Sequence, residues 1–263
     1  MIRELNEKNL IYQIRQYHLK RRVYFYPEID STNNAAKKLC NENKGGSALV
    51  VADCQTAGKG RLGRTFCSPA GTGLYVTAVY EIDGREKNFD LISPLAGLAV
   101  RDTLYNMFNL KTTIKWPNDV LYEGRKLCGI LCEAVNVGNR PKYVVVGVGV
   151  NVERGSFPDD VDCIAGAIAE YCNDEIDRNE LCIELVHNMD RYIIRSRALQ
   201  EDSKDVIDRL KACSETLGQT VRVIMPDKEF DARVLDIAEN GGLRVATAEG
   251  EQIITSGEVV HIR

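Results

Sequence analysis

The spacing of apolar residues divides the chain into strand-like and helix-like stretches. Short apolar runs predict strands at 23–26, 48–51, 74–82, 111–116, 119–123, 126–136 and 142–151. Helix-like spacing follows residue 31, resumes near Leu91 and covers 179–197 and 204–213, while residues 1–21 form a short polar helix or arm. This mixture predicts an α/β domain in which helices cover a sheet.

The run at 142–151 is apolar on both faces, as a central strand covered by helices should be. It nevertheless contains Gly147 and Gly149. Because glycine weakens a strand, we expect other groups to pack tightly against the backbone at these two positions.

The pattern changes after Cys213. Short runs rich in Val and Ile at 219–225, 229–238, 243–248 and 252–262 are separated by turn residues. Four or five short strands in so few residues predict a small antiparallel barrel. We therefore expect two domains, residues 1–214 and residues 215–263.

Composition narrows the class of protein. The 263 residues carry a net charge of −4 with mixed signs, which gives no reason to expect DNA as a partner. None of the nine cysteines has the two-residue spacing of a zinc or redox pair, and we expect the nearest two, Cys128 and Cys132, to be buried thiols in a reducing cytoplasm. The N-terminus has no signal-peptide core, and the longest apolar run, 144–150, is too short to cross a bilayer. These features predict a cytoplasmic protein with no membrane partner.

Candidate ligand-binding residues are most concentrated in residues 55–64, Gln-Thr-Ala-Gly-Lys-Gly-Arg-Leu-Gly-Arg, where three cations interleave with three glycines. Glycines let a backbone approach a ligand, and Lys and Arg bind anions. A dinucleotide fingerprint would need a helix next, but turn residues follow at 68–73. The stretch is typical of a flexible cationic loop around a phosphate-bearing ligand, with a solvated basic loop as the alternative.

Three further segments carry polar residues that are candidates for a binding site, and each also has an alternative, purely structural explanation. Asp-Ser-Thr-Asn-Asn at 30–34 lies at a strand-to-helix junction, where Asp30 or Ser31 could cap the helix. The second, at 115–119, holds the single tryptophan, which is more often a core or interface residue. Lys126 begins an apolar strand and is either an exposed strand end or aimed into a pocket.

Taken together, these segments match a known family. The motifs are Ser-Thr-Asn at 31–33, Gln-x-x-Gly-Lys-Gly-Arg-x-Gly-Arg at 55–64, Lys-Trp-Pro-Asn-Asp at 115–119, Lys-Leu-x-Gly-Ile-Leu at 126–131 and Gly-x-Gly-x-Asn at 147–151. Their order and spacing resemble the biotin protein ligases, from about residue 22 to the end. The resemblance implies a mixed sheet flanked by helices, like that of class II aminoacyl-tRNA synthetases, and a C-terminal SH3-like β-barrel.

The resemblance also implies a two-step reaction. Biotin and ATP, with Mg²⁺ on the phosphates, would give biotinyl-5′-AMP and pyrophosphate. A lysine of a biotin carboxyl carrier protein would then take the biotin and release AMP. A homodimer is compatible with this family, and no metal-ligating side chains are implied.

Residue roles follow from the same motifs. Biotin would be bound by Ser31, Thr32, Asn33, Gln55, Lys59, Gly60, Arg61 and Lys126, and the nucleotide by Arg64, Lys115, Asn118 and Asn151. Of the catalytic residues, Lys126 would meet the carboxylate and α-phosphate oxygens, because a fixed cation stabilises charge that builds there, and Arg61 would close over the biotinyl-adenylate. Asp119 would orient or deprotonate the acceptor amine.

Two positions depart from the family pattern. Lys59 stands where arginine is more common, and Phe66 where tryptophan is common.

Two other functions compete with biotin ligation. A lipoate or octanoate protein ligase shares the catalytic fold, but its substrates have no ureido ring and would not need the Ser-Thr-Asn and Gly-Lys-Gly-Arg segments. A biotin-responsive repressor would need about 60 residues of winged helix before the first strand, where some 20 are present.

Overall fold

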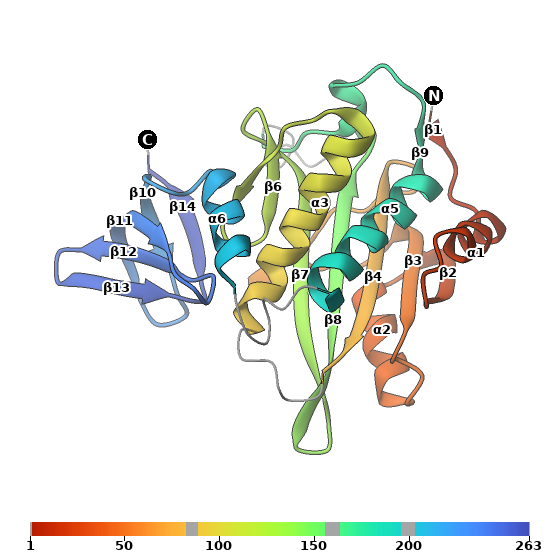
Figure 1. The fold of residues 1–263 in the computed structure, drawn as a ribbon, viewed down its shortest axis with the longest axis horizontal. Helices are drawn as coiled ribbons and strands as arrows, with labels where there is room; N and C mark the ends of the chain where they lie inside the picture. The colour runs from red at the N-terminus through yellow and green to blue at the C-terminus, as the bar shows by residue number, and fades with distance from the viewer. Residues whose placement is uncertain (1, 83–88, 156–163, 196–202, 263) are drawn as a thin grey trace.

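The computed structural model describes residues 2–82, 89–155, 164–195 and 203–262. Its centre is a seven-stranded sheet with helices on both faces, and a smaller sheet lies at one end (Figure 1). In spatial order the large sheet contains β2 (Arg22–Ile29), β3 (Ala48–Gln55), β4 (Gly73–Glu81), β8 (Arg140–Asn151), β7 (Arg125–Val137), β6 (Asp119–Tyr122) and β5 (Thr113–Lys115). Strands β2 and β3 are parallel and the other neighbours antiparallel, which confirms the predicted mixed sheet.

Side chains alternate between two apolar layers across this sheet. Leu49 and Val51 face one layer, which is covered by α3 (Ile92–Phe108) and α5 (Arg178–Asp190), seen side by side in Figure 1. Val50, between them, faces the other layer, which is covered by α2 (Thr32–Asn41). Strand β8 is buried on both faces, as its sequence predicts.

The N-terminal segment is tied to the body of the protein by a short strand pairing and by a hydrogen bond from the Asn6 backbone N–H to Asn179 Oδ1 at 2.8 Å. Strand β1 (Ile2–Arg3) pairs in parallel with β9 (Ile176–Asp177). Helix α1 (Glu7–Gln16) begins after Asn6, whose side chain accepts hydrogen bonds from the backbone N–H groups of residues 8 and 9. The predicted polar helix or arm is therefore a short capped helix.

The helix predicted over 179–197 is shorter than expected. Helix α5 ends at Asp190, residues Arg191–Arg195 form a π-helix, and residues 196 and 197 lie outside the described residues. The next helix, α6 (Lys204–Ala212), agrees with its predicted range. No helix in the described ranges is long and apolar enough to cross a membrane.

The C-terminal part forms a five-stranded antiparallel sheet that fits an SH3-like domain. Its strands are β10 (Thr220–Ile224), β11 (Glu229–Ile237), β12 (Leu243–Thr247), β13 (Gly250–Ile254) and β14 (Glu258–His261). The run predicted at 252–262 is two strands, because Gly257 adopts a φ of 109° and turns the chain between them. The boundary at residue 215 stays a prediction.

The single tryptophan connects the end of β5 to segments that flank the strands of the C-terminal sheet. The Trp116 backbone N–H donates to Thr216 Oγ1 at 3.1 Å, and its indole Nε1–H donates to the Gly241 carbonyl at 3.0 Å. Trp116 is therefore an interface residue, as a lone tryptophan often is.

Candidate functional site

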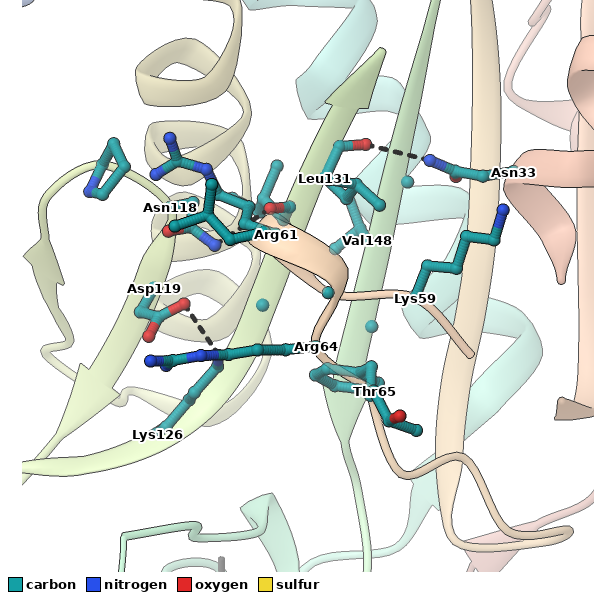
Figure 2. A pocket seen from close by; sticks show the side chains of 18 of the residues that line it. Asn33, Lys59, Arg61, Arg64, Thr65, Asn118, Asp119, Lys126, Leu131 and Val148 are labelled. Atoms are coloured by element: carbon teal, nitrogen blue, oxygen red, sulfur yellow. Dashed lines mark hydrogen bonds and ion pairs between the residues drawn. The ribbon is translucent and has the colours of Figure 1, made fainter. Parts of the chain in front are cut away.

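One pocket gathers nearly all of the predicted site residues (Figure 2). It lies between the N-terminus of α2, the loop that follows β3, strands β5 to β8, and the start of β14. The predicted residues that line it are Ser31, Thr32, Asn33, Gln55, Lys59, Gly60, Arg61, Arg64, Lys115, Asn118, Asp119 and Lys126. Asn151 is the one predicted residue outside this lining.

The cationic loop is folded into a compact turn against the pocket. Gly60 N–H donates to the Arg64 carbonyl at 2.7 Å, and Phe66 N–H donates to the Gly58 carbonyl at 2.9 Å. Residues Arg61–Gly63 form a single 3-10 turn between these bonds. Lys59 Nζ donates to Asn34 Oδ1 at 2.7 Å and so connects the loop to α2. The loop is thus a wall of the pocket, which disfavours the solvated-loop alternative.

The glycines of β8 let two side chains rest on the strand. A Cβ atom at Gly147 would overlap the Asn33 amide, and one at Gly149 would overlap the Phe66 ring. A Cβ atom at Gly129 of β7 would also lie 3.0 Å from Phe66. The close packing predicted for Gly147 and Gly149 is confirmed, and Phe66 forms part of the pocket floor.

Lys126 points into the pocket and is not an exposed strand end. Its Nζ lies 2.8 Å from Asp119 Oδ1 (Figure 2), and its side chain is 28% exposed. The same ammonium lies 5.8 Å from the centre of the Phe66 ring. Asp119 at the start of β6 therefore holds the lysine in the lining of the pocket, where an anionic ligand could compete for it.

The loop arginines face carboxylates from both domains. Arg64 Nη1 lies 2.6 Å from Glu258 Oε1, on the first residue of β14. Burial lowers the pKa of Arg61, while the charges of Asp119 and Glu258 act in the opposite direction. Sequence reasoning missed Glu258, because no spacing within the chain indicates that β14 begins beside the loop.

Hydroxyl and amide groups line the opposite wall. Gln55 Oε1 accepts from Thr32 N–H at 2.8 Å and lies 3.1 Å from Thr32 Oγ1. Gln55 Nε2 donates to Ser68 Oγ at 2.9 Å, and Ser68 donates to the Phe66 carbonyl at 2.9 Å. Ser31 is the N-cap residue of α2, yet its side chain makes no capping hydrogen bond. Ser31 therefore occupies the predicted N-cap position without the side-chain hydrogen bond of a cap, and its hydroxyl remains for another partner.

Two of the predicted nucleotide-binding residues, Asn118 and Asn151, donate side-chain hydrogen bonds to backbone carbonyl groups. Asn118 Nδ2 donates to the Ile130 carbonyl at 3.1 Å, which fixes the turn before β6. Asn151 Nδ2 donates to the carbonyls of Lys126 at 3.2 Å and Gly166 at 3.1 Å. In the described residues both donors of Asn151 are used, and only its amide oxygen is left for a ligand.

The described residues include no group of three or more side chains arranged to hold a metal ion. The carboxylates nearest the pocket, Asp119 and Glu258, are both paired with cations. A Mg²⁺ ion there would depend mainly on ligands from a nucleotide, as this ion often does.

Comparisons with known proteins agree with this geometry. Residues 25–151 match the biotin/lipoate A/B protein ligase family, and residues 216–262 match the biotin protein ligase C terminal domain. The biotin--[acetyl-CoA-carboxylase] ligase of Mycobacterium tuberculosis is 31% identical over 82% of this chain and 79% of its own length. The bifunctional ligase/repressor BirA of Bacillus spizizenii is 29% identical over 97% of this chain and 79% of its own length.

A solved structure shows the same arrangement. The biotin protein ligase of Aquifex aeolicus, in complex with biotin and ATP, superimposes with a TM-score of 0.80 and 26% identity. The match covers 93% of this chain and 100% of that one. With sequence relatives, both domains and this structure in agreement, the chain belongs to the biotin protein ligase family.

Proposed function

We propose that this protein is an ATP-dependent biotin protein ligase. The observation that carries the proposal is the two-sided pocket, in which hydroxyl and amide groups face a wall of lysine and arginine. A cyclic urea offers one acceptor and two donors, which suits the first wall, and a carboxylate beside a phosphate suits the second. Biotin and ATP, both present in the Aquifex complex, have these groups.

In the first step the biotin carboxylate oxygen attacks the α-phosphorus of ATP. The new bond is an acyl phosphate, the bond to the β-phosphate breaks, and pyrophosphate leaves. Lys126, Arg61 and Arg64, which line the pocket, are proposed to neutralise the charge on the phosphate oxygens. Mg²⁺ is proposed to neutralise the phosphates further, and Lys115, Asn118 and the amide oxygen of Asn151 are proposed to bind the nucleotide.

In the second step a lysine amine attacks the biotinyl carbonyl. An amide forms, the bond to AMP breaks, and the amine loses a proton. Asp119 is proposed to orient the amine or take this proton, since its carboxylate lies at the pocket beside Lys126. The loop from Lys59 to Arg64 is proposed to keep water from the adenylate until the acceptor arrives.

The acceptor is proposed to be a biotin carboxyl carrier protein, because relatives are named for the ligation of biotin to acetyl-CoA carboxylase. We also propose that the protein works in the cytoplasm, where its buried thiols Cys40, Cys128 and Cys182 would stay reduced. Homodimer formation and the absence of DNA binding remain predictions. Sedimentation and a gel shift with biotinyl-AMP present would check them.

The deciding experiment offers the protein three acids at once. It is incubated with ATP, Mg²⁺ and equal amounts of biotin, lipoate and octanoate, and the small molecules are identified by mass spectrometry. Biotinyl-AMP alone is the expected product. Lipoyl- or octanoyl-AMP would contradict the assignment of Ser31, Thr32 and Gln55 to a ureido ring, and no adenylate at all would contradict the enzyme.

A further inference from the structure

Asn33 lines the pocket, yet every polar atom of its side chain already has a protein partner. Its Nδ2 donates to Glu133 Oε2 at 2.8 Å and to the Leu131 carbonyl at 3.2 Å. Its Oδ1 lies 2.7 Å from Thr77 Oγ1. The residue is 4% exposed, and its amide rests on Gly147. A ligand would have to displace one of these partners to bind Asn33.

The partners also fix which way the Asn33 amide points. A carboxylate and a backbone carbonyl can only accept, so Nδ2 must face Glu133 and Leu131. Burial acts to raise the pKa of Glu133, but hydrogen bonds from Lys37 and Asn33 hold it below its usual value. Lys37 Nζ lies 2.8 Å from Glu133 Oε1. Glu133 is therefore a charged acceptor at neutral pH.

The orientation of the Asn33 amide also determines how the hydroxyl groups of Thr77 and Thr32 are hydrogen-bonded. Because Oδ1 of Asn33 can only accept, the single hydroxyl proton of Thr77 is donated to it. Thr77 Oγ1, with no exposed surface, then offers Thr32 Oγ1 a lone pair at 2.8 Å. Gln55 Oε1 also offers Thr32 a lone pair. The single Thr32 proton is thus directed to one of these two protein oxygens, and Thr32, which lines the pocket, can meet a ligand only as an acceptor.

We propose that Glu133, Asn33 and Thr77 form a hydrogen-bond relay that positions Thr32 to accept an N–H of the ligand, and that Asn33 itself does not bind the ligand. The three are positioning residues, and the relay selects for a urea-like ring over rings without N–H groups. This inference rests on the proposed function and deepens it. It changes the role of Asn33, which the family motif alone places against biotin.

A double-mutant cycle tests the relay. Asn33→Asp places a carboxylate against Glu133 and the Leu131 carbonyl, and we expect the Kd for biotin to rise by at least about tenfold. In the double variant, Glu133→Gln supplies an N–H donor to the carboxylate introduced at position 33. We expect the double variant to bind biotin several-fold more tightly than Asn33→Asp alone, because the two residues act as a unit. Affinities are measured by titration calorimetry.

The matched control is Asn41→Asp, which adds the same charge to an exposed residue at the other end of α2. Its affinity should equal that of the wild type. If Glu133→Gln leaves the defect of Asn33→Asp unchanged or deepens it, Asn33 contacts biotin directly and the relay is overturned. If the wild-type protein does not bind biotin, the proposed function fails and the relay fails with it.

A second pair of variants works even if Asn33→Asp does not fold. Thr77→Val keeps the shape of the side chain but removes the proton given to Asn33. We expect a Kd for biotin about three- to tenfold higher, and recovery in Thr77→Ser, which keeps the hydroxyl. A direct contact between Asn33 Oδ1 and biotin predicts the opposite, because Thr77→Val would free that atom. Unchanged or tighter binding in Thr77→Val would therefore overturn the inference.

Discussion

The two walls of the pocket are organised in different ways. On the cationic wall, Arg64 and Lys126 project from a turn and a strand start, are partly exposed, and pair with Glu258 and Asp119. On the polar wall, Thr32 and Asn33 are buried and bonded through the sheet. A charge pair can exchange its carboxylate for a phosphate, whereas a buried relay has one arrangement. The cationic wall is suited to chemistry that changes charge, and the polar wall to fixed recognition.

The largest expected effect is on the cationic wall. Lys126→Ala should slow biotin-dependent pyrophosphate exchange by about 100-fold, because it removes a fixed cation from the α-phosphate. Biotin should still bind through the polar wall with a much smaller loss. Lys38→Ala, an exposed lysine of α2, is the control. A near-normal exchange rate would remove Lys126 from the chemistry and would weaken the contrast between the walls.

The corresponding change on the polar wall is Gly147→Ala. The added methyl group overlaps the Asn33 amide, which its hydrogen bonds hold in place. We expect about a tenfold rise in the Kd for biotin and a fall of a few degrees in Tm. At Gly46 a Cβ atom would lie 3.5 Å from its nearest neighbour, Glu81 Oε2, so Gly46→Ala is the matched control. Unchanged biotin binding would mean that the polar wall is less fixed than the structure indicates.

Arg61→Gly should separate making the adenylate from keeping it. We expect adenylation to continue at a rate reduced by about tenfold or less, while biotin appears on lysines of an added bystander protein. The measurement is the ratio of biotin on the bystander to biotin on the carrier. A ratio equal to that of the wild type would show that Arg61 does not retain the intermediate.

The smallest effect concerns the connection between domains. Glu258→Gln releases Arg64 from its ion pair, and we expect the KM for ATP to rise about threefold with little change in kcat, since exposed pairs contribute little. Glu251→Gln, on β13 of the same sheet and paired with Arg244, is the control. A lower KM for ATP in Glu258→Gln would mean that Glu258 competes with the nucleotide for Arg64.

Much of this organisation follows from the sequence alone. Apolar spacing places the strands of the large sheet, and the glycines of β8 predict the close approach of the groups that prove to be Asn33 and Phe66. The ordered motifs identify the loop, Lys126 and the polar wall, because each motif is a short continuous segment that can be read from the sequence.

Other features depend on contacts that no local pattern encodes. Glu258 reaches the loop through the docking of a second domain, and Glu133 meets Asn33 across 100 positions of sequence. Thr77 is flanked by apolar residues in β4, and the sequence there carries no signal of the role of its hydroxyl. The split of residues 252–262 into two strands depends on the backbone conformation of Gly257.

Trp116 gives the molecule an optical reporter of its own. It is the single tryptophan in 263 residues, it lines the pocket, and its indole donates a hydrogen bond to Gly241, in the turn between β11 and β12. Its fluorescence would therefore respond both to a ligand entering the pocket and to separation of the two sheets. Tryptophan fluorescence would report ligand occupancy of the pocket in a titration and the coupling of the two domains during thermal unfolding, with no dye attached.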